Sequence, residues 1–86
     1  MKKYQKIYRY TVVFEPAEEG GYVVRVPALP GCATQAKNLA EAKKRAKEVI
    51  ELYVETLRDE DEDIPIELPG TIVAKIKIPQ KELVEK

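Results

Sequence analysis

Residues 29–58, LPGCATQAKNLAEAKKRAKEVIELYVETLR, carry the clearest structural signals of the chain. This stretch joins a Pro-Gly turn, which carries the single cysteine Cys32, to a long amphipathic segment. Asn38 is a good helix N-cap, and Glu41, three residues later, can complete a capping box with it. We therefore predict a helix from residue 39 to about residue 58. Its buried face repeats at helical steps of three and four: Leu39, Ala42, Ala46, Val49, Ile50, Tyr53, Val54 and Leu57.

The length and charge of the chain limit its number of domains and the partners it can bind. Its 86 residues predict one domain, with a core at about 7–78 and a short tail at 79–86. Fifteen basic and fifteen acidic side chains cancel, so the net charge gives no general attraction to nucleic acid or to an anionic membrane. A chain this small buries a limited core, and oligomerisation is a natural supplement.

The composition argues against a metal site and an exported or membrane protein. One cysteine forms no intramolecular disulfide, and without histidine the usual zinc-ligand spacings are absent. The two lysines near the N-terminus precede no apolar run, as a signal peptide would require. No apolar run approaches the roughly 20 residues that span a bilayer. We expect a cytoplasmic protein with no cofactor, no metal and no membrane contact.

Alternation of apolar and polar residues predicts strands on both sides of the helix. Residues 7–14 and 22–26 alternate around a loop with two glycines, which predicts a β-hairpin. Residues 32–36 can form a third, short strand, and residues 71–78, TIVAKIKI, predict the last one. The expected order is β-β-β-α-β, an α+β sheet with one helix on one face, and the last strand parallel to the first.

One helix leaves the second face of this sheet uncovered. That face is expected to mix apolar and basic side chains, which is typical of a surface that faces a second copy or a partner. Its residues are Ile7, Val13, Val23 and Val73 together with Arg9, Arg25, Lys75 and Lys77.

Two groups of acidic residues are candidates for binding a basic partner. Their ordinary interpretation is a solvated loop and a solvated linker, and the loop glutamates have no histidine or clustered aspartate to complete a catalytic site. The candidates are Glu15, Glu18 and Glu19 in the first loop, and Asp59, Glu60, Asp61, Glu62 and Asp63 after the helix.

Together these motifs resemble the HicB family of antitoxins, including its short stand-alone members of the UPF0150 type. The resemblance covers residues 7–78 and rests on FEPAEEGGY at 14–22, VPALPGCAT at 26–34, Glu41-Ala42 at the helix start and IELY at 50–53. Three features depart from the family. Ala28 replaces a common aspartate, Ala36-Lys37-Asn38 replaces Gly-Asp-Thr/Ser, and no helix-turn-helix or ribbon-helix-helix module follows the domain.

The resemblance implies a degraded ribonuclease-H-like fold without nuclease activity. Ribonuclease-H chemistry needs carboxylates that converge on two metal ions, and the predicted strands offer no acidic residue on a consistent face. We expect no catalytic residue and no enzyme activity.

Three functions compete. The leading hypothesis is an antitoxin that sequesters a small, basic, RNA-cleaving HicA-like toxin, with the acidic groups steering the encounter. The second is a stand-alone homo-oligomer, a dimer or tetramer, without a toxin partner. The third, an operator-binding repressor, would use the basic residues of the open sheet face; it is the least favoured because the chain carries no C-terminal DNA-binding module.

Cys32 has two possible roles. A small side chain after a Pro-Gly turn suits packing beneath the start of the helix. A thiol near a helix N-terminus can also be reactive. Because Asn38 caps the helix, we favour packing.

Overall fold

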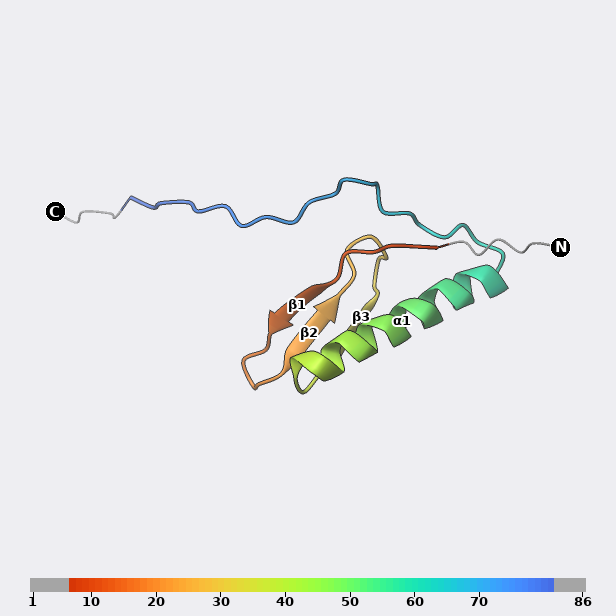
Figure 1. Cartoon of the computed structure of the whole chain (residues 1–86), viewed down its shortest axis with the longest axis horizontal. Helices are drawn as coiled ribbons and strands as arrows, with labels where there is room; N and C mark the ends of the chain where they lie inside the picture. Colours follow the sequence, from red (N-terminus) through yellow and green to blue (C-terminus); the bar gives the residue numbers. More distant parts are fainter. Residues whose placement is uncertain (1–6, 82–86) are drawn as a thin grey trace.

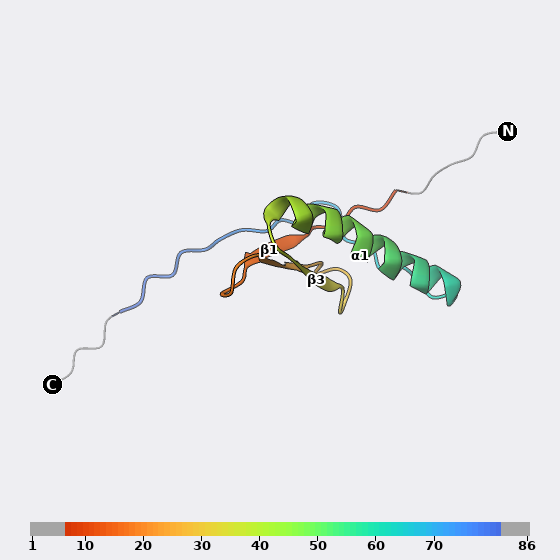
Figure 2. The same cartoon turned by 90° about the horizontal axis from the view of Figure 1, so that it is seen from below.

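The computed structural model describes residues 7–81, which form a small sheet, one helix and a long extended arm (Figure 1). The strands are β1 (Val13–Pro16), β2 (Tyr22–Arg25) and β3 (Ala33–Ala36), and the helix is α1 (Leu39–Asp59). The sheet has the order β1-β2-β3, and both strand pairs are antiparallel. The helix crosses one face of the sheet (Figure 2). The predicted α+β class, with three strands before one helix, is confirmed.

The hairpin closes as the loop glycines predict. Val13 lies opposite Arg25 and Pro16 opposite Tyr22, while the loop amides of Ala17 and Gly20 form hydrogen bonds within the turn. Gly20 and Gly21 both have positive φ angles, 102° and 77°, which an L-residue rarely adopts.

The helix begins at the predicted cap. The side-chain oxygen of Asn38 accepts a hydrogen bond from the Glu41 amide at 2.8 Å. The Glu41 carboxylate in turn accepts from the amide of Lys37, also at 2.8 Å. This reciprocal bond reaches one residue further back than in a standard capping box, but it satisfies the same kind of unpaired donor.

The end of the helix explains part of the acidic run. Asp61 has a φ of 57°, and its amide donates to the carbonyl of Arg58. The amide of Glu62 donates to the carbonyl of Leu57 at 2.9 Å. These two bonds form a Schellman motif, with Asp61 in the left-handed position that glycine usually takes. The acidic residues after α1 are therefore held on an ordered helix cap.

Two clusters of apolar side chains form the core between the sheet and α1. In the first, Ala42 and Ala46 contact Val24, so these small residues bring the helix close to the central strand, β2. The second is supplied by the turn that follows β2, with Val26, Leu29 and Cys32 all buried. Tyr10, Val12, Val49, Ile50 and Tyr53 pack around this second cluster.

Cys32 is a packing residue in this structure. Its side chain is 4% exposed, and its sulfur lies 3.9 Å from the carbonyl oxygen of Val49. Burial raises the pKa of the Cys32 thiol, which opposes formation of a reactive thiolate. The packing role is confirmed, but Cys32 packs against the middle of α1 and not beneath its start, because the turn after β2 lies against Val49, Ile50 and Tyr53.

The first strand is shorter than predicted. Residues 7–14 were expected to pair, but β1 begins only at Val13 and extends to Pro16. The reason lies in the partner strand, because β2 ends at Arg25 and the chain turns at Pro27, which has no amide hydrogen to donate. Residues 7–12 therefore continue beyond the sheet as an extended segment.

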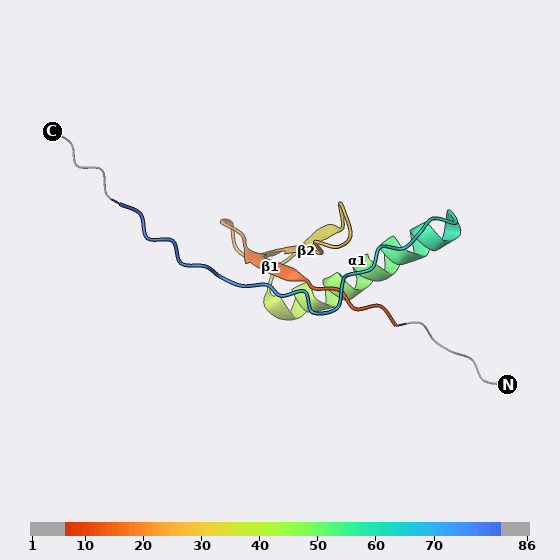
Figure 3. The same ribbon diagram turned by 90° about the horizontal axis from the view of Figure 1, so that it is seen from above.

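The predicted last strand is wrong for this structure. Residues 71–78 form no strand; they belong to an extended arm that leaves the folded body (Figure 1, Figure 3). The alternation of TIVAKIKI indicated the extended conformation correctly, but a strand also requires a neighbouring edge. Its expected parallel pairing with the first strand is likewise not formed, and β1 keeps a free outer edge.

Candidate functional site

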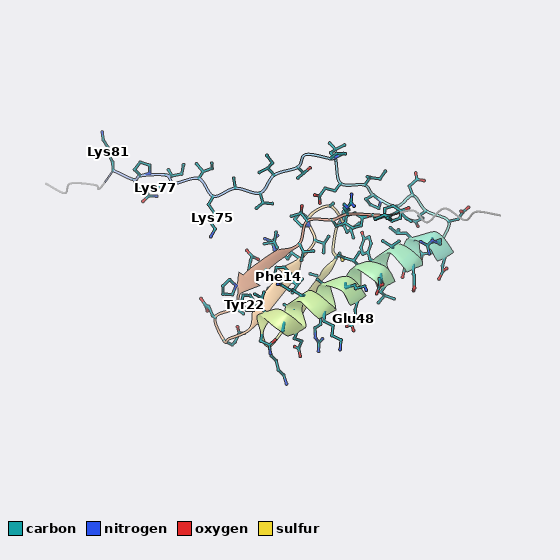
Figure 4. The ribbon with its side chains drawn as sticks, in the orientation of Figure 1. Phe14, Tyr22, Glu48, Lys75, Lys77 and Lys81 are labelled. Atoms are coloured by element: carbon teal, nitrogen blue, oxygen red, sulfur yellow. The ribbon has the colours of Figure 1, made fainter. Side chains whose placement is uncertain are left out.

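A groove of about 1120 Å³ lies between the N-terminal segment and α1. Tyr10, Val12 and Phe14 line one wall, and Ile50 and Val54 of the helix line the other. Phe14 points from β1 toward the helix (Figure 4). The groove exists because β1 is an edge strand, so no further strand covers the helix surface beside it.

The rim of the groove carries charges of both signs. Lys43, Lys47 and Arg58 stand along the helix side with Glu51 and Glu55. Charged rims around an apolar floor are typical of protein-binding surfaces, in which the apolar centre is buried and the rim stays wet. The groove can therefore accept an apolar segment of another chain.

Residues 64–70, which form the return segment after α1, are hydrogen-bonded to the chain beside the groove. The hydroxyl of Tyr10 donates a hydrogen bond to the carbonyl of Pro65 at 2.6 Å. Burial and the neighbouring Tyr8 raise the pKa of Tyr10, so the hydroxyl stays protonated and can donate. The carboxylate of Glu67 accepts two hydrogen bonds from Thr11, from the amide at 2.7 Å and from the hydroxyl at 2.5 Å. These contacts fix the point from which the arm departs.

Acidification should loosen this attachment. The hydroxyl and then the amide of Thr11 lower the pKa of Glu67 below its ordinary value of about 4.3. Since the folded-state pKa is depressed, the stabilisation is present above the unfolded-state value and is lost as the pH falls through the folded-state value. We expect the amide shift of Thr11, followed by NMR from about pH 6 to pH 2, to titrate with a midpoint below that ordinary value.

The variant Glu67→Gln keeps an oxygen acceptor and removes the titrating group. Its Thr11 amide shift should stay constant across the same pH range, whereas Thr11→Val, which retains the amide donor, should still show a titration. A midpoint at or above the ordinary glutamate value would contradict the assignment.

The three acidic residues predicted at the first loop lie in two different environments. Glu15 accepts a 2.9 Å hydrogen bond from Arg25, and this bond and the guanidinium charge lower the pKa of the Glu15 carboxyl. Its charge is thus largely balanced within the sheet. Glu18 and Glu19 stand exposed in the turn between β1 and β2.

The second acidic group lies at the other end of the molecule. Asp59 is the last residue of α1, and Asp61, Glu62 and Asp63 line a smaller hollow of about 470 Å³ with Tyr8 and other neighbours. The loop glutamates lie near the start of α1 and this group lies at its end (Figure 1). The 21-residue helix between them is about 30 Å long, so the two groups form separate surfaces.

The basic residues expected on the open sheet face do not come together. Arg25 lies on β2 and is paired with Glu15, while Lys75 and Lys77 lie on the arm, away from the sheet (Figure 4). The mixed face expected from sequence is reduced to the residues of β1 and β2, because it required the last strand to join the sheet. No basic surface of the predicted kind is assembled among residues 7–81.

Charge and spacing in the sequence did not reveal the groove. One wall belongs to the apolar face predicted for the helix, and the other comes from residues 7–14, for which alternation was predicted, so the residues themselves were visible from their periodicity. The space between them arises only because no fourth strand is paired with β1. Among the described residues, no three histidine, cysteine, aspartate or glutamate side chains lie together as metal ligands.

The structure is a small α+β fold with an open apolar groove and an acidic group near each end of α1. These features are typical of a binding protein. The family model of the HicB-like antitoxins of bacterial toxin–antitoxin systems matches residues 10–82. The chain belongs to this family. No helix within residues 7–81 is both long and apolar enough to cross a membrane.

Individual relatives agree with this membership. A UPF0150 protein of Archaeoglobus fulgidus is 45% identical over 69 residues, which are 80% of this chain and 96% of that protein. A UPF0150 protein of Thermoplasma acidophilum is 51% identical over 57 residues, 66% of this chain and 83% of its own length. Antitoxin HicB 1 of Photorhabdus laumondii is 39% identical over 64 residues, 74% of this chain and 40% of that antitoxin.

Proposed function

We propose that this chain is a non-catalytic, cytoplasmic antitoxin that binds and blocks a small, basic, RNA-cleaving toxin of the HicA type. The observation that carries the proposal is the family match, which spans the sheet, the helix and the return segment. A relative named Antitoxin HicB 1 supports it. A basic RNA-binding surface on such a toxin would be attracted by acidic groups and covered by them.

The acidic end of α1 is the better candidate for the first contact with a toxin. Asp59, Glu60, Asp61, Glu62 and Asp63 are all exposed. Because the Schellman bonds order the backbone from Asp59 to Glu62, these side chains extend from a rigid support, and fewer degrees of freedom are lost on binding. Glu18 and Glu19 form a second, smaller acidic group near the start of α1. Glu15 is already paired with Arg25.

The direct test is inhibition of RNA cleavage. A small basic protein that co-purifies with the chain from its native host should cleave RNA alone and lose this activity when the chain is added in equimolar amount. Size exclusion should show both proteins in one complex. Cleavage that continues at full rate with excess chain would overturn the proposal.

The acidic contact is tested by three variants that each remove two negative charges. Glu62→Gln/Asp63→Asn should lower the association rate with the toxin by about threefold or more at low salt, and the loss should shrink at high salt. Glu18→Gln/Glu19→Gln tests the loop, and Glu48→Gln/Glu51→Gln is the matched control on α1. Stopped-flow measurement of all three at two salt concentrations separates a local contact from a change in net charge. Equal rates in all three would contradict the assignment to the helix end.

A further inference from the structure

The arm exposes more apolar surface than a free segment of a small protein normally does. Ile72 is 82% exposed, Ile76 is 76% and Ile78 is 72%. The backbone is extended over the whole stretch, and the arm lies apart from the sheet in Figure 1. Its far end extends beyond the folded body in Figures 2 and 3. Large exposed side chains on an extended segment mark a surface that is covered in the working protein.

The pattern of the arm is that of a strand with one buried face. Ile72, Ala74, Ile76 and Ile78 share one side, and Val73, Lys75 and Lys77 stand on the other. Such a segment needs two things from its receptor: a free strand edge to pair with the backbone, and an apolar surface on one side of that edge.

The outer edge of β1 offers both. Within residues 7–81, β1 pairs only with β2, so no described strand takes up its second row of backbone donors and acceptors. The groove lies directly beside this edge, with Val12 and Phe14 on the sheet side and Ile50 and Val54 on the helix side. The opposite face of β1 carries Glu15, so the lysines of an added strand would lie on the side of a carboxylate.

The path of the chain directs the arm away from its own groove. The return segment is fixed beside Tyr10 and Thr11 by the bonds of Pro65 and Glu67. A turn then follows, in which the amide of Thr71 donates to the carbonyl of Leu68 at 3.2 Å and Gly70 has a φ of 86°. Beyond this turn, residues 72–81 continue outward, and the groove of the same chain stays open.

We propose that residues 71–78 of one copy add a strand to the outer edge of β1 in a second copy, and that the exchange is reciprocal. Ile72, Ile76 and Ile78 enter the partner's groove, and Lys75 and Lys77 remain outside it. Each copy both donates an arm and accepts one, so the assembly closes as a two-fold dimer. This dimer does not depend on the proposed toxin binding.

Sedimentation equilibrium of the full chain tests the proposal. The wild type should be a dimer at micromolar concentration. Ile72→Lys/Ile76→Lys should weaken dimerisation by about 100-fold or more, because two anchors become charges. Lys75→Ser/Lys77→Ser, on the same arm but on its other face, is the matched control and should remain dimeric. Far-UV circular dichroism should show the same helix content in all three proteins.

A second measurement identifies the receptor. In a dimer formed from isotope-labelled and unlabelled copies, the Ile76 methyl groups of one copy should give nuclear Overhauser contacts to the Phe14 ring of the other. A wild type that stays monomeric would overturn the proposal. Contacts only within one copy, or a dimer that survives Ile72→Lys/Ile76→Lys, would also overturn it, because the arm would then fold onto its own β1 or another surface would join the copies.

Discussion

Replacement of Leu29 by alanine should lower the free energy of unfolding by about 2–5 kcal/mol. Leu29 is 1% exposed and, with Val26 and Cys32, forms the cluster that holds the Pro-Gly turn against α1. The turn is braced by its own bonds, among them the Cys32 amide to the Leu29 carbonyl at 2.9 Å. A braced turn cannot collapse into the space that a truncated side chain leaves, so the cavity should persist and the cost should be high.

Urea denaturation of Leu29→Ala and wild type, at one fixed protein concentration, measures this loss. Leu52→Ala is the matched control, because Leu52 lies on α1 with 64% of its surface exposed and should change stability by less than about 0.5 kcal/mol. Equal losses in the two variants would show that the turn after β2 is not part of the core.

The elements that the sequence predicted well are those with local causes. The start of α1 depends on Asn38 and Glu41, which lie three residues apart and bond to each other or to the adjacent backbone. The hairpin turn depends on the positive φ angles of Gly20 and Gly21, and the Gly-Gly pair itself indicates this local requirement. Both follow from conformational preferences that act over a few positions, and these are visible in a single sequence.

The elements that the sequence predicted poorly depend on a distant partner. The alternation in residues 71–78 shows an extended segment with two different faces, but no local feature says which edge it joins. The length of the first strand is likewise set across the sheet, because β2 ends before Pro27 and leaves residues 7–12 unpaired. Strand pairing is a property of two segments, so alternation in one of them gives only half of the information.

The candidate site shows the same division. The sequence identified acidic residues by composition, but it did not show that Glu15 is balanced by Arg25 or that Asp61 closes the helix. It also offered both acidic groups as contacts for one basic partner, whereas the structure places them at opposite ends of α1. The groove beside β1 depends on the absence of a covering strand, which only the tertiary arrangement reveals.

Replacement of Gly21 by alanine should cost about 2–5 kcal/mol and break the contact between the hairpin turn and the end of β3. Its φ of 77° lies in the left-handed region, which costs an L-residue about 1–2 kcal/mol. A Cβ atom at this position would also come far inside van der Waals distance of the backbone carbonyl of Ala36. That carbonyl belongs to β3, so relief of the overlap requires a shift of a strand, at about 1–3 kcal/mol more.

Gly31→Ala separates the two causes. Gly31 has almost the same φ, 78°, but a Cβ atom there would meet nothing within 4 Å. This variant should therefore lose only about 1–2 kcal/mol, the conformational part. The full stability of a chain of this length is about 4–13 kcal/mol, so urea denaturation resolves the difference between the variants. If the two glycine variants are equally destabilised, the close approach of Gly21 to β3 contributes nothing, and the φ angle alone explains the requirement for glycine.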